Sequence, residues 1–98
     1  MIERHVYLRL QPEHRVDPAL QEVIERSRAL STLPSVHALQ VLSPADDQAS
    51  AAWDVCLVIR LKSYSDYESF RDDPSHREYV DHFLKLRVQV IKAWNFKE

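Results

Sequence analysis

Residues 2–10 alternate between apolar and polar side chains, which is the period of a β-strand whose two faces differ. One face is aliphatic and the other is polar and aromatic: Ile2, Val6, Leu8 and Leu10 against His5, Tyr7 and Arg9. Residues 52–62 alternate in the same way, with Trp53, Val55, Leu57, Ile59 and Leu61 on one face. Cys56 and Val58 make the middle of the other face apolar too, so this run is expected to be a central strand.

Two further runs bring the expected number of strands to four. Residues 36–42 predict a short strand, and residues 87–96 predict the last one. The last run divides into Val88, Val90, Trp94 and Phe96 on one face and Ile91 and Ala93 on the other. Residues 43–50 are polar and are expected to form a loop.

Apolar residues at helical spacing occupy the other two segments. A first helix is expected to begin at Asp17-Pro18, with Asp17 as its cap, and to end before Pro34. A second is expected to open at Ser63 or Ser65 and to restart at Asp73-Pro74.

The element order β-α-β-β-α-β predicts a ferredoxin-like α+β domain over residues 1–98, with a four-stranded antiparallel sheet and both helices on one face. Two helices cover only one sheet face, and an uncovered apolar face is rarely left in water. A second copy of the chain is the commonest cover, so a homodimer is expected. Its predicted interface consists of Val6, Leu8, Val58 and Ile91.

Composition excludes several function classes. The chain has 98 residues and no glycine, and glycine-rich phosphate loops therefore cannot form. The net charge is −2 and no basic cluster occurs, which argues against a nucleic-acid partner. No secretory leader and no apolar run of about 20 residues is present, so a cytoplasmic location without a membrane partner is expected. The single cysteine, Cys56, is expected to be a buried small hydrophobe, and no metal-ligand spacing is found, so neither a metal nor a cofactor is expected.

Five residues, His5, Phe70, Pro74, His76 and Tyr79, stand in an order and spacing that resembles the stress-responsive dimeric A/B-barrel family. The resemblance covers essentially the whole chain. It implies a dimer whose two sheets form a barrel with the helices outside, and it implies that the His5 face of the first strand turns toward the helices. The chain departs from the family at Ser35 and at Leu42-Ser43, where members often carry glycine, and at Asn95, where they carry an acidic residue.

Some enzymatic members of that family cyclise polyketides with a helix-start histidine as base and an upstream tyrosine as its hydrogen-bonding partner. His76 fills the histidine position, but Phe70 fills the tyrosine position and has no hydroxyl. Tyr67, Tyr7 or Tyr79 could supply that group instead. A lone histidine base remains possible.

His76 is the leading candidate for chemistry, because the positive end of a restarted helix favours a neutral imidazole that can accept a proton. His5 is expected to share one cavity with it between sheet and helices. The other expected lining residues are Tyr7, Leu57, Ile59, Phe70 and Trp94. His14 and His82 are expected at the surface, and His37 is expected to be structural.

Three hypotheses follow from the sequence. The first is a small homodimer that binds an apolar or aromatic ligand in this cavity. The second is a cofactor-independent enzyme, a cyclase or monooxygenase, with His76 as general base. The third is a stress-protective structural oligomer without pocket chemistry, so the sequence leaves open whether the protein is an enzyme.

Overall fold

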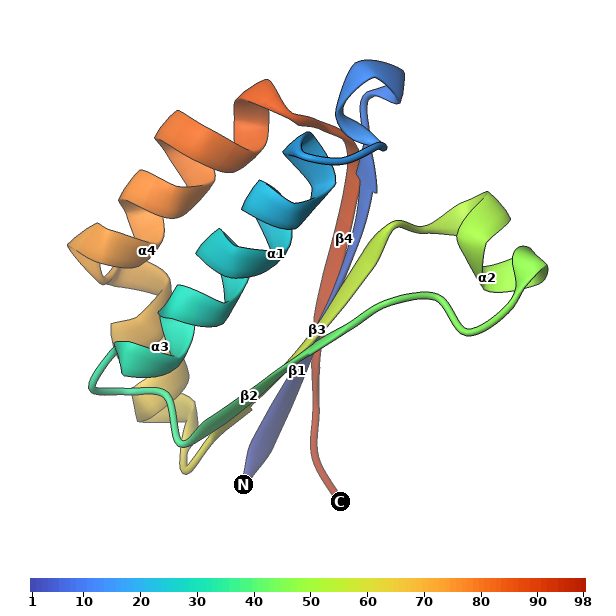
Figure 1. The fold of residues 1–98 in the computed structure, drawn as a ribbon. Helices are drawn as coiled ribbons and strands as arrows, with labels where there is room; N and C mark the ends of the chain where they lie inside the picture. The colour runs from blue at the N-terminus through green and yellow to red at the C-terminus, as the bar shows by residue number, and fades with distance from the viewer.

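The computed structural model describes residues 1–98, and its four strands form one antiparallel sheet in the order β2-β3-β1-β4 (Figure 1). The strands are β1 (Ile2–Leu10), β2 (Ala38–Leu42), β3 (Val55–Leu61) and β4 (Val88–Phe96). The predicted four-stranded ferredoxin-like sheet is thereby confirmed. β3 and β1 are the two central strands, and the long β1 pairs with both β3 and β4.

The helices that cover the sheet lie in one layer on one side of it (Figure 1). They are α1 (Ala19–Arg28), α3 (Tyr64–Asp72) and α4 (Pro74–Glu78). Single turns of other helix types extend α1 over Ala29–Thr32 and α4 over Tyr79–Phe83 and Leu84–Leu86. A further short helix, α2 (Asp47–Ala52), lies apart from this layer, between β2 and β3 along the chain.

The cross-strand register determines which side chains share a sheet face. Val6 lies opposite Leu57, and Leu8 lies opposite Val55. Directly opposed residues of antiparallel strands point to the same side, so the aliphatic faces of β1 and β3 form one continuous surface. The helices cover this surface, leaving Val6 6% exposed and Leu8 0% exposed. We call it the inner face of the sheet.

The predicted dimer interface is therefore wrong at Val6 and Leu8, and the sheet face predicted for Ile91 is wrong as well. Val6 and Leu8 belong to the core of the single chain, because an aliphatic strand face is the one that helices bury. Ile91 lies opposite Leu8 and hence also on the inner face. Only Val58, opposite His5, lies on the side away from the helices.

That second side, the outer face, has aromatic and apolar residues at its centre. They are His5 and Tyr7 from β1, Cys56 and Val58 from β3, and Trp94 and Phe96 from β4. The aromatic rings contact one another: the His5 and Phe96 centroids are 5.2 Å apart, and those of Tyr7 and Trp94 are 6.5 Å apart. The layer of α1, α3 and α4 lies on the opposite side of the sheet (Figure 1), while α2 and the loop before it lie beside Tyr7 and Cys56 at one end of the outer face.

Two irregularities change the faces expected from simple alternation. The register of β1 with β4 slips so that Arg9 faces Val90 while Leu10 faces Val88, which moves Val88 onto the core. Trp53 precedes β3 and places its ring 5.5 Å from that of Tyr7, on the outer side, although the sequence predicted it for the core face.

Two features of the helices depart from expectation, the start of α1 and the presence of α2, and a third decides between two expected caps. α1 begins at Ala19 without a side-chain cap, so Asp17 does not cap it. Ser63, rather than Ser65, caps α3 by accepting a hydrogen bond from the amide of Asp66. The expected loop after β2 contains α2, which Asp46 caps by accepting from the amide of Ala49 at 2.9 Å.

Candidate functional site

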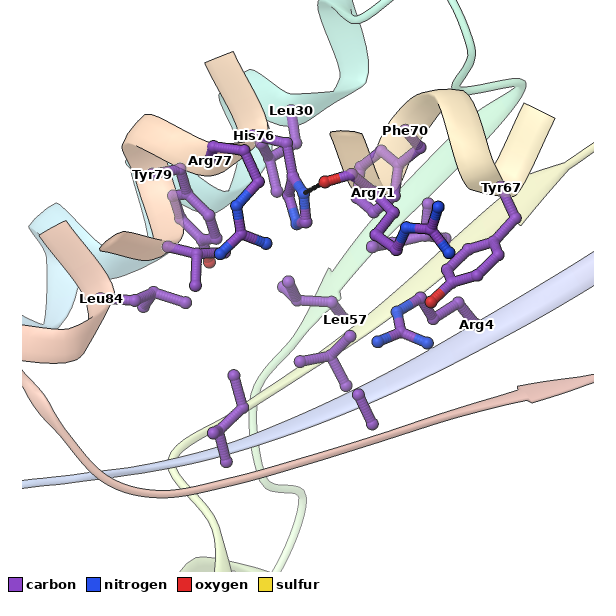
Figure 2. A pocket seen from close by; sticks show the side chains of 15 residues that line it. Arg4, Leu30, Leu57, Tyr67, Phe70, Arg71, His76, Arg77, Tyr79 and Leu84 are labelled. Atoms are coloured by element: carbon purple, nitrogen blue, oxygen red, sulfur yellow. Dashed lines mark hydrogen bonds between the residues drawn. The ribbon is translucent and has the colours of Figure 1, made fainter. Parts of the chain in front are cut away.

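A cavity of about 150 Å³ lies between the inner face of the sheet and the helices (Figure 2). Its walls are mostly apolar, and they come from β1, β3, β4, α3 and the chain around α1 and α4: Val6, Leu30, Leu57, Ile59, Phe70, Tyr79, Val80, Leu84, Ile91 and Ala93. Five polar side chains complete the lining: Arg4, Tyr67, Arg71, His76 and Arg77. An apolar cavity of about this volume can hold one benzene-sized ring.

His76 reaches this cavity from the first turn of α4. Asp73 caps that turn by accepting a hydrogen bond from the amide of Ser75 at 2.8 Å. The imidazole Nδ1 lies 3.2 Å from the carbonyl oxygen of Arg71 (Figure 2). A carbonyl can only accept, so Nδ1 carries the proton and Nε2 of the neutral ring is left with a lone pair. The ring also packs against Phe70, with centroids 4.1 Å apart.

Burial lowers the pKa of His76 below its ordinary value of 6.5, and the charges of Arg77 and Arg4 act in the same direction. The Arg71 carbonyl and the Asp73 carboxylate oppose the shift without reversing it. This direction is the one that the sequence predicted, toward a neutral imidazole. Its largest cause, however, is loss of hydration in the pocket rather than the helix end.

We expect NMR titration to give His76 a midpoint below 6.5, with the Nδ1–H tautomer at neutral pH. Because the unfolded chain binds this proton more tightly, the associated stability is complete above pH 6.5 and is lost as the pH falls from there through the folded pKa. Nitrogen-edited imidazole spectra measure the titration midpoint and the tautomer, and His76→Gln assigns the signal. A midpoint at or above 6.5 would contradict the pocket environment described here.

Three arginines border the cavity, and two of them are already paired. Arg71 forms a two-pronged ion pair with Asp72 at 2.9 and 3.0 Å, and the guanidinium of Arg77 donates to Asp81 at 2.7 and 3.3 Å.

Arg4 is bonded differently from the other two arginines. It donates from Nη1 to the neutral amide oxygen of Asn95 at 3.0 Å and lies 5.0 Å from the centre of the Tyr67 ring. It is the arginine of the cavity that carries its charge without a carboxylate partner.

The three tyrosines considered as substitutes for a hydroxyl at Phe70 differ in position. Tyr79 is buried and shares a 2.7 Å hydrogen bond with Ser27, and burial raises its pKa to about 12, as expected of a structural side chain. Tyr7 lies on the outer face. Tyr67 lines the cavity, so it is the tyrosine placed to present a hydroxyl there.

The predicted site residues are divided between the two sides of the sheet. His76, Phe70, Leu57 and Ile59 line the cavity as expected. His5, Tyr7 and Trp94 lie on the outer face, and the prediction that His5 and His76 share a cavity is wrong. The imidazole of His5 instead contacts the carboxylate of Glu3 at 2.7 Å, and alternation along β1 turns it away from the aliphatic residues that the helices bury.

The sequence prediction missed the polar end of the cavity, above all Arg4. A signal for it exists: Arg4 shares the even-numbered face of the first strand with Ile2, Val6, Leu8 and Leu10, where it is the one charged residue. A charge in the middle of a core-facing pattern indicates that the residue has a functional or structural partner.

No three His, Cys, Asp or Glu side chains are grouped so as to hold a metal ion. None of the helices has the length and apolar character required to span a membrane.

Comparison with solved structures places the fold among known ones. A ferredoxin-like Dabb family protein from Mesorhizobium loti is similar over 99% of this chain and 95% of its own, with a TM-score of 0.80 and 15% identity. A dimeric ferredoxin-like protein of unknown function from Thermobifida fusca gives a TM-score of 0.78 over 99% and 90%, at 18% identity. A hydroxynitrile lyase from Passiflora edulis gives 0.78 over 97% and 91%, at 16% identity.

These identities are low, so the structural likenesses establish the fold alone. No curated protein sequence matches the chain. The sequence pattern of one family does match, and it extends over residues 2–93, from the start of β1 to the middle of β4. The chain therefore belongs to the Stress Responsive A/B Barrel Domain family, Dabb.

Proposed function

We propose that this protein is a homodimer in which each protomer binds a small apolar or aromatic molecule between its sheet and its helices. The cavity carries this proposal. It is apolar on most of its surface, holds about 150 Å³, and has a few convergent polar groups at one end, which is the usual composition of a small-molecule site. A purely structural protein gains nothing from such a space, because an unfilled cavity lowers stability.

The outer face supports the homodimer. Trp94 is 52% exposed and Phe96 is 54% exposed in the single chain, and Val58 lies beside them across β1. Contiguous aromatic and aliphatic side chains of this kind usually mark an interface. A symmetric copy would cover them with the same surface, and the Thermobifida fusca protein of this fold is described as dimeric.

Base catalysis is the second candidate, and the hydrogen bond of His76 favours it. The Arg71 carbonyl holds the Nδ1–H, so Nε2 can take a proton from a ligand in the cavity. Arg4 and Tyr67 border the same space and could stabilise the negative charge that remains (Figure 2). The Passiflora edulis protein of this fold is an enzyme, a hydroxynitrile lyase.

The test uses neutral single-ring probes, benzyl alcohol and benzamide, with calorimetry and amide NMR. We expect shift changes at Leu57, Ile59 and Phe70, and thermal stabilisation that approaches about 2.7 kcal/mol at 100 times the Kd. Ala93→Phe fills the cavity and should abolish both effects, whereas Ala52→Phe, on exposed α2, should abolish neither. If neither benzyl alcohol nor benzamide bound to the unmodified protein, the proposal would be refuted.

A further inference from the structure

We infer that the ligand of this cavity is a small aromatic or apolar anion, a carboxylate or an enolate, and that Arg4 binds its negative group. The inference rests on the proposed ligand-binding function and specifies its ligand class. It starts from the position of Arg4 in the middle of a surface that is otherwise aliphatic.

Arg4 extends from β1, a central strand, onto the inner face of the sheet between Ile2 and Val6. The side chain is half-buried. A guanidinium remains charged at every physiological pH, so partial removal from water costs free energy that a partner normally offsets. In this chain its side-chain hydrogen-bond partner is the neutral amide of Asn95, which supplies no opposite charge.

The remaining donors of Arg4 are free for a ligand. A guanidinium has five N–H donors in a planar fork, and one of them is used on Asn95. By contrast, the forks of Arg71 and Arg77 are occupied by Asp72 and Asp81. A carboxylate arriving in the cavity would thus find one guanidinium able to form a two-pronged pair without displacing a protein carboxylate.

The fork of Arg4 is also held in position before any ligand arrives. Asn95 fixes one edge, and the guanidinium carbon lies over the Tyr67 ring, 5.0 Å from its centre. Such preorganisation lowers the entropic cost of binding.

Figure 2 shows Arg4 and Tyr67 at one end of the cavity, with His76 extending from the helices into the same space. A ring lying on Leu57 would direct its anionic group toward Arg4 and leave its other atoms facing the imidazole.

Two probes of nearly equal shape test the inference, benzoate and benzamide, measured by calorimetry at low ionic strength. We expect benzoate to bind at least about tenfold more tightly, since hydrogen bonds between two charged groups are about twice as strong as those between neutral groups. Added salt should weaken benzoate binding more than benzamide binding. Bound benzoate should raise the pKa of His76, because it offsets the Arg4 charge that helps to lower it.

Arg4→Met keeps the length of the side chain and removes its charge. It should abolish the preference for benzoate, because it weakens binding of the charged carboxylate much more than binding of the neutral carboxamide. Arg4→Lys should retain part of the preference and checks that loss is not caused by misfolding. Arg28→Met, on the exposed surface of α1, removes the same charge outside the cavity and should behave like the unmodified protein.

The outcomes separate this inference from the proposed function. Benzamide binding equal to or tighter than benzoate binding would overturn the anion inference and leave the ligand site standing. A benzoate preference that survives Arg4→Met would overturn the role of Arg4. Failure of both probes to bind would overturn the ligand site and the inference together.

Discussion

Replacing Val58 with glutamate is expected to dissociate the proposed homodimer while each protomer stays folded. Val58 lies at the centre of the outer face, on β3 and opposite His5. In the single chain it is half-buried, so a glutamate there can still reach water. In the dimer the same carboxylate would be buried without a partner, and two-fold symmetry would introduce it twice. We expect the dimer Kd to rise by at least about a hundredfold, which corresponds to about 2.7 kcal/mol.

Sedimentation equilibrium measures this effect directly, because each chain has a mass of 11.5 kDa. Val58→Thr preserves shape and should have a much smaller effect. Ser69→Glu adds the same charge on exposed α3 and should leave the dimer intact. An unmodified protein that sediments as a folded monomer would refute the homodimer.

The strands and their order along the chain could be predicted from the sequence, because alternation depends only on neighbouring residues. Which strand faces lie together could not. β3 is apolar on both faces at its middle, since Leu57 and Ile59 lie on one and Cys56 and Val58 on the other. Either face could therefore have been matched with the aliphatic face of β1. The register Val6 with Leu57 decides the matter, and a register is a long-range property that periodicity does not contain.

The candidate site was predictable where local chemistry marks it and not where tertiary contacts create it. Asp73-Pro74 marks a helix start, and His76 follows in its first turn. The neutral state of this imidazole depends mainly on burial, which arises only when α4 packs over the sheet. The role of Arg4 depends on Asn95, 91 positions away along the chain. Such a pair is visible only once β1 and β4 are known to lie side by side.

Leu8→Ala is expected to lower the free energy of unfolding by about 2–5 kcal/mol, the usual range for truncating a buried leucine. Leu8 is 0% exposed in the single chain and belongs to the hydrophobic core, so its truncation leaves a cavity there. That loss is large beside a total stability of about 5–15 kcal/mol for a domain. Urea unfolding at one fixed protein concentration measures it, because the stability of a dimer depends on concentration.

Ile91→Ala is the matched control, since Ile91 lies directly opposite Leu8 on β4 but is 44% exposed. Its truncation removes fewer contacts and should cost less than about 1 kcal/mol. The pair distinguishes core from interface, because a core truncation destabilises the protomer and leaves the outer face unchanged. Leu8→Ala should therefore retain the dimer wherever it remains folded, in contrast to Val58→Glu. If Leu8→Ala instead dissociated the dimer and left protomer stability within about 1 kcal/mol, the inner and outer faces of β1 would have to be exchanged. His5 would then turn toward His76, and Arg4 would no longer reach the cavity.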